Sequence, residues 1–366
     1  MAIYIILLIY ILVLPFVIRA VSPNEQTLEK KVAFWGMLAV FLLLALKNTS
    51  VGIDTKGYEQ QYYIARITEW ERWNYVYFER GYIFLQKFFS KLDLSFGWFT
   101  ALVYAFECFV FYKLIAKHSK DARFSLMFFV CYQFLVFSLS GLRQTLSMSI
   151  CVLAFLIIER DTVFSFFAGI VLMLMALSIH SGTFAFIAVI FIWFLSKRGV
   201  GINLITTFVA VAAGILIRPF MHSFINENLR KTSFDLSFLT SGNVLFIVLL
   251  FMFAMFTCYM RQKNQSGKRA INISGESYMD RMILRLLLYT VIGQFIFSGS
   301  TIIRSVMYIT IYIPAFFPGI IKKYASRSQT FIKMALGAVL LFIFLNYTLL
   351  PNQFELIPYK FFWQTT

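Results

Sequence analysis

The feature that most constrains this chain is a series of long apolar runs separated by short polar stretches. A helix that crosses a bilayer needs roughly 20 mostly apolar residues, and these runs approach that length. They predict an all-α polytopic membrane protein with about 12 transmembrane helices, with one short pair that would also fit a re-entrant segment. The runs are Tyr4–Ile18, Val32–Leu46, Phe96–Ile115, Phe124–Leu139, Leu142–Ile158, Val163–Ile179, Thr183–Leu195, Ile202–Ile217, Val244–Met260, Met282–Phe297, Ile302–Ile321 and Phe331–Leu350.

Composition supports the same fold class. Hydrophobic residues make up 60% of the sequence and charged residues 14%, against roughly 45–50% and ~25% in soluble proteins. We therefore expect one transmembrane domain over residues 1–366. The four cysteines lie inside apolar runs, without CxxC or Cys/His spacing. They predict packed core residues, so we expect neither a disulfide nor a metal site. We also expect no cofactor.

The net charge of +16 would suggest a nucleic-acid partner in a soluble protein. In a membrane protein it instead follows from the enrichment of Lys and Arg in cytoplasmic loops, so we expect a lipid bilayer and no nucleic acid. An external N-terminus places 19 of the 33 basic residues in inner loops. We therefore predict that both termini lie outside and that these loops are cytoplasmic: 19–31, 113–123, 159–162, 196–200, 261–281 and 322–333.

Two external segments are long enough to carry structure of their own. The first, 47–94, contains Tyr63, Ile67 and Trp70 at helical spacing beside charged residues. This pattern predicts amphipathic helices that lie on the outer surface of the membrane. The second, 218–241, has mixed charge and begins next to a proline, which predicts a short helix and a loop.

Several ionisable groups fall at the outer ends of the predicted spans. They are Arg143, His180, Arg218 and Arg304, with Tyr308 four residues after Arg304 and on the same helix face. The external loop adds two acids, Asp54 and Glu79, and Tyr58 one turn after Asp54. Arginine binds phosphate in a bidentate manner, and a carboxylate or imidazole can take a proton from a sugar hydroxyl. An outward cavity for a phosphate-bearing, hydroxyl-rich substrate is therefore predicted.

Each of these residues also has a purely structural explanation. An arginine at the end of a span can be a snorkelling anchor, and His180 can be a packing residue. Glu107 inside a predicted span is rare, but pairing with a neighbouring helix would explain it.

The order of the motifs resembles the EpsG family, which belongs with the Wzy-type polymerases of capsule, exopolysaccharide and O-antigen synthesis. The resemblance covers nearly the whole chain and rests on the following residues: Val51-Gly52-Ile53-Asp54-Thr55 with Tyr58, Glu79-Arg80-Gly81-Tyr82, Leu142-Arg143-Gln144, His180-Ser181-Gly182, Arg304 with Tyr308, and Ile357-Pro358-Tyr359.

The resemblance implies a GT-C-like, metal-independent glycosyltransferase on the outer face of the bacterial cytoplasmic membrane. Its substrates would be undecaprenyl-pyrophosphate-linked glycan donor and acceptor, and a flippase and a chain-length regulator would be further partners. The implied pyrophosphate ligands are Arg143 and Arg304, with Arg80. Asp54, Glu79 and His180 are alternative acceptor bases. Together the expected catalytic residues are Asp54, Glu79, Arg143, His180 and Arg304, and the expected substrate-binding residues are Tyr58, Arg80, Gln144, Arg218 and Tyr308.

Two other functions are compatible with the sequence. A transporter or flippase of lipid-linked oligosaccharide would need cavity arginines, but also charges at the membrane midplane and broken helices. A membrane acyltransferase that modifies the polysaccharide would use a histidine base without needing several phosphate-binding arginines. The gathering of ionisable groups at one face favours the polymerase.

Overall fold

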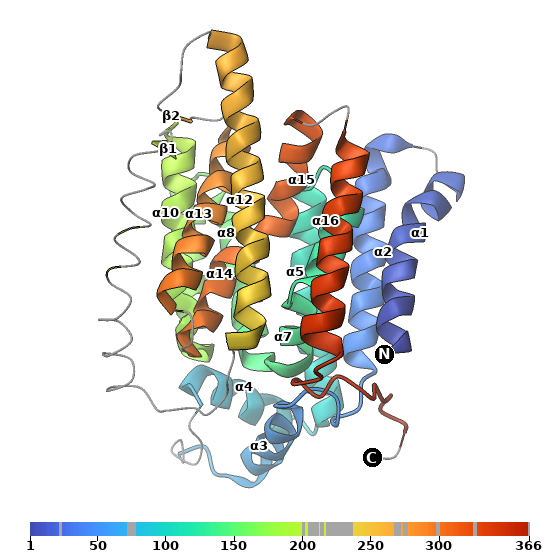
Figure 1. The fold of residues 1–366 in the computed structure, drawn as a ribbon. Helices are drawn as coiled ribbons and strands as arrows, with labels where there is room; N and C mark the ends of the chain where they lie inside the picture. The colour runs from blue at the N-terminus through green and yellow to red at the C-terminus, as the bar shows by residue number, and fades with distance from the viewer. Residues whose placement is uncertain are drawn as a thin grey trace. The chain divides into compact units, whose positions relative to one another are not determined.

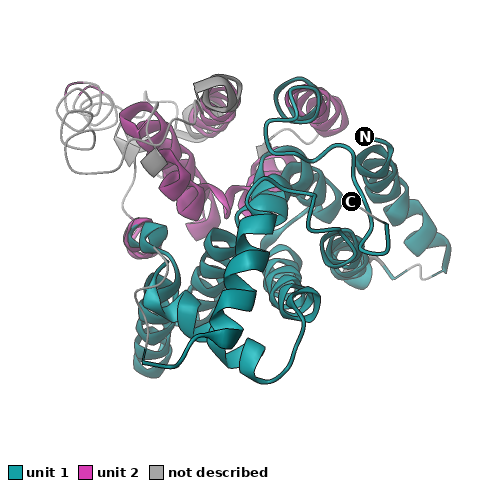
Figure 2. Cartoon of the chain, turned by 90° about the horizontal axis from the view of Figure 1, so that it is seen from below, with its two compact units in different colours: residues 1–184, 344–366 teal, residues 185–343 magenta. Residues whose placement is uncertain are grey.

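The computed structural model groups the chain into two compact units, Met1–Phe184 with Phe344–Thr366 (unit 1) and Ala185–Ile343 (unit 2) (Figure 2). Our expectation from sequence was one domain over residues 1–366. The structure describes residues 1–21, 24–71, 78–199, 202–203, 212, 216, 237–266, 272–273, 277–297, 301–324 and 328–364.

Unit 1 is a bundle of long helices with two shorter helices at one end (Figure 1). α5 packs against α2 and α8, while α9 packs along α8 and α1 lies against α2. The short helices α3 and α4 pack on each other, and α4 also contacts α9. The bundle helices are α1 Ala2–Val21, α2 Glu25–Ala45, α5 Phe96–His118, α6 Ala122–Cys131, α7 Phe134–Ser140, α8 Leu142–Ile158 and α9 Val163–Ile179. The helices at the end are α3 Thr55–Ile67 and α4 Arg80–Lys91, and the 3-10 turn η1 Ser181–Ala185 follows α9.

Local signals in the sequence set the ends of these helices. Ser95 accepts a hydrogen bond from the backbone N–H of Trp98 and begins α5. Thr162 and Ser165 form a reciprocal capping box at the start of α9. The polypeptide turns at Gly141, so α7 ends at Ser140 and α8 begins at Leu142.

Aromatic packing holds α3 and α4 against the end of α5. The ring of Tyr62 stacks on Phe99 with 5.1 Å between centroids, and its hydroxyl donates to the carbonyl of Leu94 at 2.9 Å. Tyr82 of α4 is fully buried and contacts Tyr58 and Phe99 edge-on or tilted. We name this region of unit 1 the α3–α4 end.

The C-terminal residues of unit 1 brace the loop between α2 and α3. The backbone N–H groups of Gly52 and Ile53 each donate to carbonyls of Glu355 and Phe354 at 3.0 Å. Asn48 donates in the same way to Lys360 at 2.8 Å. The loop therefore obtains its conformation from residues about 300 positions away.

Unit 2 is built around α13, which packs on α10, α12 and α15. Arg281 Nε donates to the carbonyl of Ser196 at 2.7 Å, and the buried Arg285 donates to its hydroxyl at 3.2 Å. Cations near the C-terminus of α10 suit the helix dipole. The elements are α10 Phe186–Lys197, β1 Ile202–Asn203, α12 Ser237–Ser266, β2 Asn272–Ile273, α13 Tyr278–Phe297, the 3-10 turn η2 Thr301–Val306, α14 Met307–Thr310, α15 Ile313–Tyr324 and α16 Gln329–Ile343, continued by the π-turn η3 Phe344–Leu349 of unit 1.

The protein is a helical, multi-pass membrane protein. Among the described residues, 3 helices are long and apolar enough to cross a bilayer, or up to 5 if each of two bent pairs is one span. The expected run Phe124–Leu139 is bent by 51° between α6 and α7, and Ile302–Ile321 is bent by 50° between α14 and α15. Most of the expected span Ile202–Ile217 and most of the segment 218–241 lie outside the described residues.

Candidate functional site

Three of the predicted motifs meet at the α3–α4 end of unit 1. Arg143 forms an ion pair with Glu79, and the other carboxylate oxygen of Glu79 accepts a hydrogen bond from the backbone N–H of Ser181 at 3.0 Å. The Arg143 guanidinium lies 4.2 Å from the centroid of the Phe78 ring and contacts the Tyr58 hydroxyl. We name Tyr58, Phe78, Glu79, Arg143 and Ser181 the Arg143 cluster.

The position of Arg143 follows from the turn that begins α8. Gly141 precedes the helix, so Arg143 lies in its first turn, where the unpaired backbone N–H groups carry partial positive charge. A cation at this end opposes the helix dipole and needs an external partner, which Glu79 supplies. The Nε atom of Arg143 is buried and has no hydrogen-bond partner within the described chain. The helix end therefore combines a guanidinium group with a backbone environment that favours anions.

Glu79 is held in place by the close approach of α4 to α9. It precedes α4 in an extended conformation, and Gly81 follows in the first turn. A Cβ atom on Gly81 would lie 2.7 Å from the Ser178 carbonyl oxygen, so only glycine fits there without a shift. This contact places the Glu79 carboxylate within hydrogen-bonding distance of the backbone N–H of Ser181.

α3 contributes Tyr58 and Asp54. Tyr58 is buried, and burial raises the pKa of its hydroxyl, although the nearby Arg143 opposes that change. Asp54 precedes α3 and makes no side-chain capping bond, and its charge adds to the rise in the pKa of Tyr58. Asp54 is half-buried. Tyr58 is therefore placed against Arg143, and Asp54 is an electrostatic neighbour of Tyr58.

His180 ends α9 beside the Arg143 cluster. Its Nδ1 accepts a hydrogen bond from the backbone N–H of Gly182 at 3.1 Å. In the neutral imidazole the proton therefore lies on Nε2, which can donate a hydrogen bond. The carbonyl of His180 accepts from Thr183, so the turn 180–183 is closed by its own bonds.

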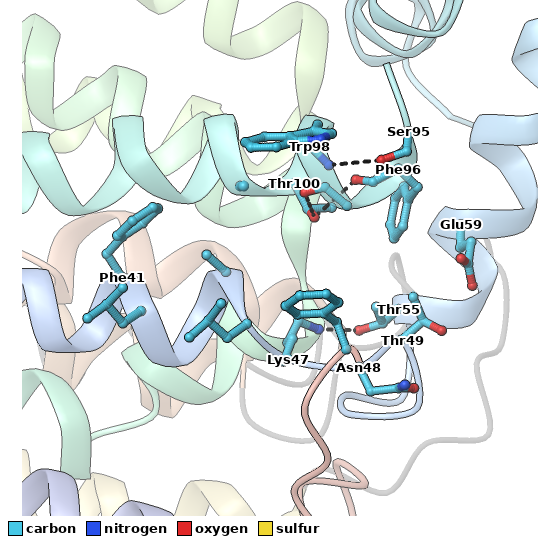
Figure 3. Close-up of a pocket in the computed structure, with 16 residues that line it drawn as sticks. Phe41, Lys47, Asn48, Thr49, Thr55, Glu59, Ser95, Phe96, Trp98 and Thr100 are labelled. Atoms are coloured by element: carbon cyan, nitrogen blue, oxygen red, sulfur yellow. Dashed lines mark hydrogen bonds between the residues drawn. The ribbon is translucent and has the colours of Figure 1, made fainter. Parts of the chain in front are cut away.

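Sequence reasoning missed Lys47, the buried cation of this region. Its Nζ donates to the carbonyls of Val51 and Leu139 and to the Thr55 hydroxyl, each at 2.7 Å, and Figure 3 shows the bond to Thr55. Burial lowers the pKa of Lys47 to about 7. The side chain ties the Asp54 loop to α7, four residues before Arg143. One lysine after an apolar run resembles an interfacial anchor, so no sequence signal distinguishes it.

For the other predicted residues the structure gives burial and the unit to which each belongs. Arg80 is exposed to solvent and Gln144 is buried. Arg304, half-buried in η2, and Tyr308, fully buried in α14, belong to unit 2. Arg218 lies outside the described residues.

Glu107 is fully buried in α5. It accepts hydrogen bonds from Ser138 of α7 and from Thr145 of α8. Its Oε2 atom has no hydrogen-bond partner in the described part of the chain. The expected partner on a neighbouring helix is thus a pair of hydroxyl groups, and no ion pair to Glu107 is formed among the described residues.

The Arg143 cluster can bind an anion and orient hydroxyl groups. Phe78 covers one face of the guanidinium, and Glu79 and Tyr58 contact it, which leaves the exposed part of the guanidinium beside the first turn of α8 for a ligand. In the described ranges, no three His, Cys, Asp or Glu side chains are grouped as metal ligands.

Comparison with known proteins identifies the family. A sequence model of the EpsG family matches residues 31–361, a range that contains every residue of the Arg143 cluster. No curated protein and no solved structure matches the chain. The family resemblance predicted from the motifs is thus confirmed. The chain belongs to the EpsG family and is a membrane protein of exopolysaccharide biosynthesis.

Proposed function

We propose that this protein is a Wzy-type polymerase, which joins undecaprenyl-pyrophosphate-linked oligosaccharide repeat units into exopolysaccharide, capsule or O-antigen. The observation that carries the proposal is the convergence of three family motifs on Arg143 at the N-terminus of α8. A pyrophosphate group is the anion that such a site suits.

In the proposed reaction, a hydroxyl oxygen of the acceptor glycan attacks the anomeric carbon of the donor glycan. The bond from that carbon to the pyrophosphate breaks, and undecaprenyl pyrophosphate leaves with the bonding electrons. Arg143 and the N–H groups of α8 stabilise the negative charge on the leaving oxygen, and preorganised donors of this kind usually make the largest contribution to catalysis.

The proton of the attacking hydroxyl goes to Asp54. Both oxygens of Glu79 are engaged, by Arg143 and by Ser181, so Glu79 acts as a positioning residue. His180 accepts a hydrogen bond at Nδ1, so the lone pair of its neutral imidazole is already engaged. Asp54 is half-buried at the start of α3 and acts electrostatically on Tyr58, whose hydroxyl contacts Arg143.

The proposal includes the topology that the basic loops predict. The protein has about 12 spans in a GT-C-like arrangement, with both termini and the Arg143 cluster on the outer face of the bacterial cytoplasmic membrane. A flippase supplies lipid-linked repeat units to that face, and a chain-length regulator acts on the product. Arg304 is proposed as a second pyrophosphate ligand on the basis of the family resemblance.

One observation favours a different function, transport of the same lipid-linked sugars. Glu107 is a buried carboxylate in a span, and its partner Ser138 lies on the bent pair of helices α6 and α7. Buried acids and broken helices are features of transporters. If transport is the function, Glu107→Gln abolishes movement of lipid-linked oligosaccharide across vesicles.

The test is polymerisation by the purified protein in vesicles that contain lipid-linked repeat units. A polymerase produces a ladder of glycan lengths on a gel, and Arg143→Ala loses it while Glu107→Gln keeps it. Translocation of single repeat units without a ladder would show a transporter. In cells, deletion of a polymerase leaves single repeat units on lipid, whereas loss of an acyltransferase leaves unmodified polymer of full length.

A further inference from the structure

A groove lined by α2 and α5 runs along unit 1 and contains two cavities. The first, of about 590 Å³, lies beside the start of α5 and the residues after α2 (Figure 3). The second, of about 230 Å³, lies further along the same two helices. Phe41 lines both, so the cavities are neighbouring parts of one groove.

The groove is long and slender. Its lining on α5 extends from Gly97 in the first cavity to Tyr112 in the second. At 1.5 Å per residue this stretch measures about 22 Å, which is most of the hydrocarbon thickness of a bilayer. The exposed side chains Leu42 and Trp98 flank the first cavity. An occupant would therefore be an extended chain.

The two ends of the groove differ in polarity. The second cavity is lined by side chains such as Met37, Leu38 and Phe109, which offer almost no hydrogen-bonding groups. The first cavity ends at Thr49, Thr55 and Glu59, on the loop after α2 and on α3. This arrangement suits an amphiphile with an apolar chain and a hydroxyl-bearing head.

The head-group end has groups left for a ligand. Thr49 and Glu59 make no hydrogen bond or ion pair with other described residues, and Figure 3 shows both at the same end of the cavity. All three protons of Lys47 are donated to protein oxygens, so Lys47 contributes charge but no further donor. A carboxylate with a hydroxyl group favours sugar hydroxyls over a bare phosphate.

We propose that this groove holds the polyisoprenoid chain of the undecaprenyl carrier, an inference that rests on the proposed function. The chain lies between α2 and α5, the pyrophosphate that follows it leaves the groove toward Arg143, and hydroxyls of the first sugar beyond the pyrophosphate reach Thr49 and Glu59. Glu59 follows Tyr58, whose hydroxyl contacts Arg143. One α3 turn thus connects the end of the groove with the Arg143 cluster, and the carrier delivers its pyrophosphate there.

A second apolar groove provides a matched control. It is lined by α1 and α2, with Ile9, Val13 and Trp35, and no residue of α3 or α5 contributes to it. It would accept any acyl chain of the bilayer. A phospholipid, which carries two chains, is the competing occupant of the α2–α5 groove.

The experiment is photo-crosslinking in vesicles of phosphatidylethanolamine and phosphatidylglycerol that contain undecaprenyl phosphate as the probe. A photoreactive benzoylphenylalanine is placed in the second cavity (Leu38→benzoylphenylalanine) or in the control groove (Val13→benzoylphenylalanine), and adducts are identified by mass. We expect the ratio of carrier to phospholipid adducts to be about tenfold higher at Leu38, equal to about 1.4 kcal/mol. Equal ratios at the two sites would overturn the proposal.

Filling the groove is the second measurement. Ala101→Trp adds a large side chain to the first cavity, whereas Leu102→Trp places the same side chain on the neighbouring exposed position of α5. The first change should abolish selective capture at Leu38 and the second should preserve it, with both proteins checked for monodispersity. Unchanged capture in Ala101→Trp also overturns the proposal. Because binding requires no polymerisation, selective capture without a glycan ladder would retain the groove and reject the proposed function, and the reverse result would reject the groove alone.

Discussion

The two ends of α8 carry charges of the wrong sign for the helix dipole, but each is compensated differently. At the N-terminus, Arg143 pairs with one carboxylate, Glu79. At the C-terminus, Glu159 pairs with two bases, Lys117 at 2.5 Å and His118 at 3.0 Å. Burial alone would raise the pKa of Glu159, but the two bases outweigh it, and the pKa is lowered.

The difference separates an occupied charge cluster from an open one. Glu159 contacts both Lys117 and His118, and its side chain is 11% exposed, so little remains for a ligand. Arg143 and Glu79 are 19% and 26% exposed, and Nε of Arg143 has no partner in the described structure. The C-terminal pairs join α5 to α8, whereas the N-terminal pair joins α8 to the residue before α4 and leaves both partners partly exposed.

The strongest test of this difference is replacement of Arg143 by lysine. Lysine keeps the charge but loses the planar fork, so Arg143→Lys should be nearly as inactive as Arg143→Ala. The expected loss is about a hundred- to thousandfold in polymerisation rate, which corresponds to about 2.7–4 kcal/mol. The readout is the glycan ladder at matched protein levels. Arg66→Lys, in an exposed pair with Asp93, is the control and should keep the full ladder. A full ladder from Arg143→Lys would reduce Arg143 to an interfacial anchor.

The second test removes one acid from each end of α8. Glu79→Gln keeps the shape but loses the charge-assisted bond to Arg143, worth about 1.5–3 kcal/mol, so the polymerisation rate should fall about ten- to hundredfold. Glu159→Gln loses its ion pairs to Lys117 and His118 at the other end. It should lower the melting temperature and leave the rate per folded molecule unchanged. Equal loss of activity in both variants would contradict the division into an open and an occupied end.

The third test disturbs the contact between α4 and α9 that positions Glu79. Gly81→Ala places a Cβ atom against the Ser178 backbone, and overpacking of this kind costs about 1–3 kcal/mol. We expect a lower melting temperature and lower activity, because α4 must shift away from α9. Gly57→Ala is the matched control, since a Cβ atom there meets nothing within 4 Å. Its stability should be unchanged or slightly higher. Identical behaviour of the two variants would show that the α4–α9 contact is not needed.

The fourth test concerns the pH dependence from Lys47. Because its pKa is about 7 in the folded protein and 10.5 in its ordinary state, the unfolded chain binds more protons between these pH values. The stability penalty of the buried charge is therefore largest below pH 7 and declines as the pH rises. Between pH 7 and pH 9, wild-type protein should gain about 2 kcal/mol relative to Lys47→Met. The measurement is the midpoint of denaturation in detergent. The same pH dependence in both proteins would remove Lys47 as its source.

The sequence predicts helices well where residues that begin or end helices coincide with the ends of apolar runs. The run Leu142–Ile158 matches α8, because Gly141 precedes it and charged residues follow it. The run Phe124–Leu139 is apolar throughout, so nothing in it marks the bend between α6 and α7, where Gln133 adopts a left-handed conformation. That bend is set by packing rather than by local residue preference.

The site shows the same division. Placement of Arg143 and His180 at the ends of helices follows from where the apolar runs begin and stop, and placement of Asp54 and Glu79 in the segment 47–94 follows from its polar sequence. Their partners do not follow, because the pairing of Glu79 with both Arg143 and Ser181 requires α4 to meet α8 and α9 in three dimensions. Lys47 illustrates the limit: its three acceptors come from loop and helix-end positions that no pattern connects.

The bonds between residues 354–360 and residues 48–53 also have a consequence for synthesis. Asn48 and its partner Gln364 are separated by 316 residues. At about 5–20 residues per second, the ribosome needs tens of seconds to make the intervening chain. During that time the helices before Asn48 can enter the membrane. The C-terminal residues that hold the loop carrying Asp54 have not yet been made. A chain interrupted ahead of residue 354 would therefore reach the membrane with the loop that carries Asp54 unbraced.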